Sequence, residues 1–226
     1  MSNPVLKTYT KKFLISYTNR YICGVKFIPR SEKTRQFIIE TTAALFNKKG
    51  YAGTSMSDIT TATKLTKGSI YGNFENKEEV ALAVFEYNAG KRNKIINERI
   101  QKAVTNRDKL MVYATIYGST GASVFAEGGC PLLNTGTEAD DTHEPLRKKV
   151  SAELIQWQKE IVMIINNGIV SKEFRKDTDP QKMAFTIVAI IEGGIFIART
   201  TKTLSNLDQT MDTIKEIIQS ISLKKK

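Results

Sequence analysis

The segment from residue 54 to residue 77 carries the side chains of this chain that are best suited to bind a polyanion. Thr54 and Ser55 offer hydroxyl groups at its start, and Lys77 offers an ammonium group at its end. The remaining candidates are small or polar and lie between them: Thr66, Lys67, Gly68, Ser69, Tyr71 and Asn73. Hydroxyl, amide and ammonium groups are the usual partners of phosphate oxygens and base edges. The residues from Lys67 to Asn73 therefore form a face that is poor for burial and well suited to base edges and phosphates.

Two short helices are predicted to position these side chains. Ser55 can cap the first helix, with Asp58 three residues later in its first turn. Thr66 can cap the second helix, and residues 63–65 form the turn between them. Two short helices joined by such a turn are the unit that fits a major groove. The spacing therefore predicts a helix-turn-helix.

The apolar residues of the segment should face inward. We expect Ile59 and Ala62 to form the inner face of the first helix, and Ile70 and Phe74 that of the second. Leu65 can fill the angle between the helices. A longer helix should start at a third cap, Asn76, with Glu79 placed to return the capping bond.

The run Thr66–Val80 resembles the signature of the TetR family of bacterial regulators, together with the pairs Leu45-Phe46, Gly50-Tyr51, Thr54-Ser55 and Asp58-Ile59 before it. The resemblance is close over residues 31–85 and extends beyond them only as helix order and length. It implies phosphate contacts by four residues: Thr54, Ser55, Tyr71 and Lys77. It also implies that three residues lie in the groove, with the first as the best candidate for reading a base: Lys67, Ser69 and Asn73.

Two positions depart from the family pattern. Lys64 stands where the family often has a glycine in the turn, and a positive φ there would cost about 1 kcal/mol. Gly72-Asn73 replaces a bulkier pair, which leaves the base preference open.

The charge distribution supports a polyanion-binding region near the N-terminus. Residues 1–30 carry six basic side chains and no acidic one, residues 31–103 carry 12 basic and 8 acidic, and residues 104–226 carry 16 and 15. We therefore expect a basic extension at 1–30, a DNA-binding domain at 31–77 and a ligand-binding and dimerisation domain at 78–226. For the extension, a DNA-binding arm, disorder and a start assigned too early remain open alternatives.

The rest of the chain has helical spacing of apolar residues, notably from Leu146 to Ile164 and from Leu207 to Ile221. A helix that opens at Asp179-Pro180 is apolar on most sides and must be covered on more than one. We predict an all-α fold of about nine helices, in which a three-helix head with a helix-turn-helix precedes a helical effector-binding and dimerisation body.

The body is expected to hold an effector pocket, as the resemblance implies. Its candidate lining residues are one cysteine and five aromatic residues: Tyr113, Tyr117, Phe125, Cys130, Trp157 and Phe185. The aromatic residues could equally belong to the core. Gly129-Cys130-Pro131 resembles a segment in one branch of the family's sensor domains, but a helix break with a buried cysteine explains it as well. A redox role for Cys130 requires an exposed thiol of low pKa.

The acidic residues around His143 and the isolated Glu192 each allow more than one interpretation. His143 stands among Asp140, Asp141 and Glu144, where capping of a helix is a better interpretation than a metal site. Glu192 lies among isoleucines, and we favour a structural pairing with Arg199 over a ligand cation or exposure to solvent. Gly193-Gly194 beside it allows helices to approach closely, consistent with dimerisation through the last two helices.

Together with the resemblance, these observations predict a cytoplasmic homodimer that binds a near-palindromic double-stranded operator. The resemblance alone implies that it is a repressor, which releases the operator when a small-molecule effector binds. No membrane partner is expected, since no apolar run reaches about 18 residues without interruption. No cofactor or metal is expected either. The alternatives are a small-molecule-binding enzyme on a helical scaffold and a DNA-binding architectural protein without an effector. The chain has one histidine and no recognisable catalytic arrangement, so we do not expect an enzyme.

Overall fold

The computed structural model of the chain describes residues 21–22, 25–26, 30–118 and 127–223. A short antiparallel pair, β1 (Tyr21–Ile22) and β2 (Val25–Lys26), lies in the N-terminal extension, where we predicted no element. Every other element among the described residues is a helix: α2 (Arg30–Lys49), α3 (Met56–Thr63), α4 (Lys67–Tyr71), α5 (Lys77–Lys102), α6 (Asn106–Ile116), α7 (Pro131–Ala139), α8 (Glu144–Val170), α9 (Pro180–Thr200) and α10 (Ser205–Ile221). The all-α prediction is confirmed.

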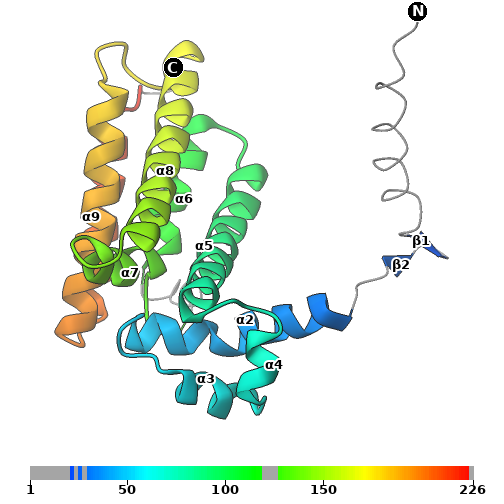
Figure 1. Ribbon diagram of the computed structural model, residues 1–226. Coiled ribbons are helices and arrows are strands. Elements are labelled where there is room, and N and C mark those ends of the chain that lie inside the picture. The colour runs from blue at the N-terminus through cyan, green and yellow to red at the C-terminus, as the bar shows by residue number, and fades with distance from the viewer. Residues whose placement is uncertain (1–20, 23–24, 27–29, 119–126, 224–226) are drawn as a thin grey trace, which may run out of the picture.

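The head consists of α2, α3 and α4, packed against the first turns of α5 (Figure 1). Its core is built from isoleucine, phenylalanine and valine side chains of all four helices, including Ile38, Ile59, Ile70, Phe74 and Val80. Because α3 and α4 are too short to be stable alone, this shared core holds them in place. The inward positions predicted for Ile59, Ile70 and Phe74 are confirmed.

The body comprises the rest of α5 together with α6–α10, and its helices rise from the head in Figure 1. The long helix α5 serves both cores, since Val84 packs in the head whereas Phe85 and Ile96 pack in the body. Head and body are thus joined by a continuous helix.

The helix α9 is long and apolar enough, by length and composition alone, to cross a membrane. It packs between α8 and α10, with Ile187, Ile191 and Ile195 buried in the core of the body. It also carries the acidic residue Glu192. We therefore interpret α9 as a core helix of the body.

Candidate DNA-binding surface and buried sensor cluster

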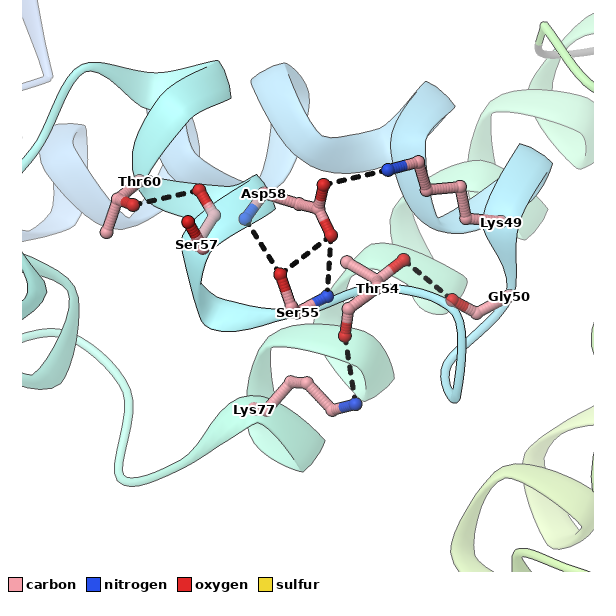
Figure 2. Close-up of polar contacts among 8 residues, drawn as sticks. All are labelled: Lys49, Gly50, Thr54, Ser55, Ser57, Asp58, Thr60 and Lys77. Carbon is pink, nitrogen blue, oxygen red and sulfur yellow. Dashed lines mark hydrogen bonds and ion pairs between the residues drawn. The ribbon is translucent and has the colours of Figure 1, made fainter.

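The start of α3 is fixed by the predicted capping box. The Ser55 hydroxyl accepts a hydrogen bond from the Asp58 backbone N–H at 3.0 Å, and the Asp58 carboxylate accepts one from the Ser55 N–H at 2.9 Å (Figure 2). The Lys49 ammonium lies 2.7 Å from the same carboxylate and, with the Ser55 N–H, holds the pKa of Asp58 well below its usual range. The contacts tie α3 to the end of α2 and orient Ser55 at the exposed edge of the head.

The inner face of α3 differs from the prediction in one residue. Ala62 is exposed, and Thr63 is buried in its place, one helical turn after Ile59. Thr63 can be buried because its hydroxyl donates to the Ile59 carbonyl at 2.8 Å and accepts from the Leu65 N–H at 3.3 Å. Because its hydroxyl group has hydrogen-bond partners nearby, Thr63 can occupy a buried position where an apolar residue would be expected.

The turn between α3 and α4 contains the left-handed residue that the sequence indicated. Lys64 has φ 57° and ψ 23°, a conformation that costs a non-glycine residue about 1–2 kcal/mol. The prediction of a positive φ at this departure from the family pattern is confirmed.

Replacing Lys64 with glycine is expected to stabilise the protein. Glycine removes the left-handed strain, and its greater freedom in the unfolded chain offsets part of that gain, so the free energy of unfolding should rise by about 0.5–1 kcal/mol. Denaturant unfolding followed by circular dichroism measures the change. Lys64→Ala keeps the strain and should leave stability within about 0.5 kcal/mol. Equal stability of the two variants would contradict the strain at this turn.

The helix α4 exposes a small polar face. Its cap is Thr66, whose hydroxyl accepts from the Ser69 N–H at 3.1 Å. Lys67 and Gly68 are exposed, and Tyr71 is 51% exposed in spite of its size. Asn73 is half-buried, with its side-chain N–H donating to the Ser69 carbonyl at 2.8 Å. The outward surface thus offers the ammonium group of Lys67, the phenol of Tyr71 and the accessible backbone of Gly68, all of which can contact phosphates or bases.

Thr54 and Lys77 have internal partners. Thr54 is fully buried, and its hydroxyl donates to the Gly50 carbonyl at 2.7 Å (Figure 2). The Lys77 ammonium donates to the carbonyls of Tyr51 and Thr54 at 2.8 and 2.9 Å and lies 4.1 Å from the centre of the Tyr51 ring. In the structure, carbonyls of the loop before α3 accept the hydrogen bonds of both side chains, and their phosphate contacts stay a prediction of the resemblance.

The base of the head is also held by α7 of the body. The carboxylate of Glu138 accepts from the backbone N–H groups of Tyr51 and Ala52, each at 2.8 Å. Gly50 precedes them with φ 74°, and a Cβ there would lie 2.3 Å from the Glu138 carboxylate. The loop is therefore shaped to receive this one side chain, which sequence analysis missed because its partners lie 86 and 87 residues away.

Asparagine side chains make a second connection beside Glu138. The Asn47 amide donates to the Gly129 carbonyl at 3.0 Å, and the Asn134 amide donates to the Asn47 carbonyl at 3.0 Å. The C-terminal end of α2 is thus bonded to both the first turn of α7 and the residues just before it.

The first turn of α8 carries the predicted cap. The Nδ1 atom of His143 accepts from the Leu146 N–H at 3.3 Å, so the capping interpretation of this histidine is confirmed. Its Nε2 atom lies 3.2 Å from the Glu78 carboxylate of α5, and its ring stacks edge-on against Tyr51. His143 thereby joins α8 to both α5 and the head.

Four of the six candidate pocket residues come together in the body. Tyr113, Tyr117, Cys130 and Trp157 are all buried, and the ring centres of both tyrosines lie about 6 Å from that of Trp157 (6.2 and 6.0 Å). The other two are Phe185, which is 63% exposed on α9 and does not belong to this group, and Phe125, which lies outside the described residues. Because α9 is apolar on most sides, the spacing of its residues could not show whether Phe185 points into the body or outward.

Arg92 of α5 lies at the centre of this group and was not among the candidates. It is 2% exposed, and its guanidinium carbon lies 3.8 Å from the centre of the Trp157 ring. A signal was present in the sequence, since Arg92 continues the buried positions Phe85, Ala89 and Ile96 of α5 in steps of four, three and four. The charged residues that surround it in the sequence, at positions 91–99, hide this signal. Arg92, Tyr113, Tyr117, Cys130, Trp157 and Glu192 are called the sensor cluster below.

Glu192 pairs with Cys130 and not with Arg199 as we had favoured. The Cys130 thiol donates to one carboxylate oxygen of Glu192, with 3.1 Å between sulfur and oxygen. Burial raises the pKa of Glu192, and burial together with the neighbouring Glu192 raises the pKa of the Cys130 thiol. Cys130 therefore lacks the exposed, low-pKa thiol that a redox switch needs.

Comparison with known proteins follows the same division into head and body. Residues 38–84 match the family model described as bacterial regulatory proteins, tetR family, and residues 107–214 match that of the tetracyclin repressor-like C-terminal domain. A TetR-family transcriptional regulator from Cytophaga hutchinsonii is 50% identical, with a TM-score of 0.85, 88% of this chain covered and 100% of that chain. A TetR transcriptional regulator from Chloroflexus aurantiacus is 34% identical, with a TM-score of 0.82 and coverage of 87% and 100%. The transcriptional repressor DhaR of a Mycobacterium species is 26% identical over 81% of this chain and 91% of its own.

Proposed function

Because this chain belongs to the TetR family of transcriptional regulators, we propose that it is a cytoplasmic, homodimeric repressor that releases a near-palindromic operator when a small molecule binds its body. The observation that supports this most directly is the capped pair α3–α4, which presents exposed Lys67 and Tyr71 at one end of the continuous helix α5. An all-helical head of this kind, joined to a body by one rigid helix, can couple an event in the body to DNA affinity.

In the proposed complex each subunit places residues 66–74 in a major groove. Lys67 reads a base edge, Gly68 lets the backbone approach, and Ser69 and Asn73 lie along the groove. Tyr71 and the exposed edge at Ser55 and Thr66 contact phosphates. Most of the affinity comes from these phosphate contacts and is therefore sensitive to salt, whereas the sequence preference comes from α4.

An exposed apolar strip on α9 supports dimerisation through the last two helices. Phe185, Phe196 and Ile197 are 63%, 55% and 51% exposed, and exposed Ala189 and Gly193 lie between them on the helix. A continuous apolar strip of this kind usually marks a surface that a partner covers. A second copy of the chain would bring two such strips together about a twofold axis, as a near-palindromic operator requires.

Two helices can carry the signal from the sensor cluster to the head. Arg92 of the cluster lies on α5, whose first turns form part of the core of the head. Cys130 of the cluster is the N-terminal cap residue of α7, and Glu138 near the end of that helix holds the loop before α3. Displacement of either helix by an effector would shift the two α4 helices relative to each other, with a coupling of about 1–3 kcal/mol.

Removal of the Glu138 carboxylate is expected to loosen the head from the body. Glu138→Ala leaves the N–H groups of Tyr51 and Ala52 without their charged acceptor, which should lower the free energy of unfolding by about 1–2 kcal/mol, given that the site is partly exposed. Hydrogen exchange of these two amides should accelerate. Thr137→Ala, in which an exposed hydroxyl bonded only within α7 is lost, is the matched control. Equal amide protection in both variants would contradict this connection.

Selection of bound sequences from random DNA tests the proposed function as a whole. We expect enrichment of one near-palindromic sequence whose half-sites are about one helical turn apart or a multiple of it. An architectural protein would enrich no palindrome, and an enzyme would show no salt-dependent binding to a specific sequence. Failure to enrich a palindrome would overturn the proposal.

A further inference from the structure

Arg92 leaves one edge of its guanidinium group without partners inside the body. Its Nη1 atom donates to the Asn93 side-chain oxygen at 2.9 Å, whereas Nε and Nη2 have no hydrogen-bond partner within the described part of the chain. In a planar guanidinium group, Nε–H and the adjacent Nη2–H point the same way and form the fork that binds a carboxylate through two parallel hydrogen bonds. The open edge of Arg92 is therefore the one used for carboxylate recognition.

This open edge is unfavourable as it stands. Both nitrogen atoms are closed to bulk solvent, so bulk water does not supply the missing acceptor. Glu192 acts on Arg92 through its charge, but no direct contact pairs the two side chains. A buried cation with no carboxylate bonded to it is unfavourable because its burial is only partly offset. None of the ion pairs among the described residues includes Arg92. A group that supplied two acceptor oxygens here would remove that penalty.

Two further donors beside Arg92 are in the same condition. The Tyr113 hydroxyl and the Trp157 indole N–H are buried and have no hydrogen-bond partner among the described residues. The Trp157 ring also stacks on the Arg92 guanidinium group at 3.8 Å. A cation, a phenol and an indole N–H thus lie together with flat aromatic surfaces, which suits a ligand that combines an anionic end with a planar apolar body.

The acidic member of the cluster is compatible with such a ligand. One carboxylate oxygen of Glu192 accepts the hydrogen bond from Cys130, and the other, Oε2, has no partner among the described residues. Burial raises the pKa of Glu192 against the lowering effects of the Cys130 hydrogen bond and the Arg92 charge, and so disfavours the negative charge that would repel an anion.

We propose that Arg92 anchors the effector through a carboxylate group, so that the effector is a small aromatic carboxylic acid whose ring lies against Trp157. This inference rests on the proposed function, since it names the class of molecule that the body senses. Because the edge of Arg92 is closed to solvent here, the helices around it must part to admit the acid. That movement acts on α5 directly, through Arg92, and on α7, through Cys130.

Matched pairs of acids and primary amides test the anchor. Benzoate, phenylacetate and cinnamate are titrated into the full-length protein by calorimetry, each beside its amide, which has the same shape but no charge. We expect at least one acid to bind 10-fold or more tightly than its amide. Binding of no acid more tightly than its amide would overturn the proposal, and this comparison uses only the wild-type protein.

Two substitutions, each of which removes one ionisable group, show which residue is responsible. Arg92→Gln should reduce the preference of that acid over its amide to less than threefold, because the fork and its charge are both lost. Glu192→Gln, which removes the acid of the cluster, should keep the preference. A preference that survives Arg92→Gln, or that is lost only in Glu192→Gln, would overturn the role of Arg92. Circular dichroism melting checks that both variants fold. Trp157→Phe is a milder variant, in which only the indole N–H and the ring shape change, and it should bind the same acid less tightly than the wild-type protein does.

A release assay on the selected operator separates this inference from the proposed function. If the acid binds through Arg92 and lowers operator affinity, both stand. If it binds through Arg92 without changing operator affinity, the carboxylate site stands and its role as an effector site is overturned. If the operator is bound but no acid is preferred, the carboxylate site is overturned and the DNA-binding function stands.

Discussion

Gly193→Arg is expected to convert the dimer into a monomer and to lower operator affinity about 100-fold or more. In the proposed dimer this glycine lies between Phe185 and Phe196 on the apolar strip of α9, where a long charged side chain would be buried without a partner. Loss of the dimer leaves each head to bind one half-site alone, which removes the gain from simultaneous binding. Sedimentation gives the oligomeric state, and titration of the selected operator gives the affinity.

The single subunit should tolerate this change. A Cβ at Gly193 meets no atom within 4 Å in one chain, and arginine favours helix more than glycine does. Gly90→Arg on α5 is a matched control, since that glycine is also exposed, helical and without a neighbour within 4 Å of an added Cβ. We expect Gly90→Arg to remain dimeric. A dimeric Gly193→Arg variant with full operator affinity would show that the interface lies elsewhere.

Lys67→Ala should weaken operator binding by about 1–3 kcal/mol and relax the preference at one base position in each half-site. Lys67 is exposed on the first turn of α4, where a side chain can reach a base edge in the major groove. Competition titrations with operators substituted at each position measure both effects.

Two further variants distinguish base reading from general attraction. Tyr71→Phe removes a hydroxyl that we assign to a phosphate and should weaken all sequences alike. Lys159→Ala removes the same charge as Lys67→Ala from an exposed position on α8 of the body and should leave operator binding unchanged. If Lys67→Ala changes neither affinity nor preference, α4 does not read the operator through this residue.

Local signals in the sequence determined the helices of the head and their limits. The caps Ser55 and Thr66 each bond to a backbone N–H three residues later, an interaction that sequence spacing specifies directly. The third cap, Asn76, forms as predicted, but Glu79 returns its bond to the N–H of Glu75 and not to that of Asn76. The chain before a cap is free to turn, so sequence spacing locates the N–H donor only to within a residue.

The charge asymmetry and the apolar spacing likewise predicted a DNA-binding head and an all-helical body. The sequence could not decide how the polar residues are used. Thr54 and Lys77 have the chemistry of phosphate ligands, yet carbonyls of the loop before α3 take their hydrogen bonds. The same limit applies to α9, where Phe185 has the type of a pocket residue but lies on the exposed side.

Only the tertiary structure brought Arg92, Trp157 and Glu192 together and placed Glu138 against the head. Contacts within three or four residues follow from the helical repeat, which every residue of a helix shares. Contacts across 60 or more residues depend on how whole helices pack, and packing sums many weak interactions that no single residue type reveals. The sequence by itself therefore determined the helix-turn-helix at 54–77, whereas the tertiary structure decided which of its polar groups face outward and which residues of the body could sense a ligand.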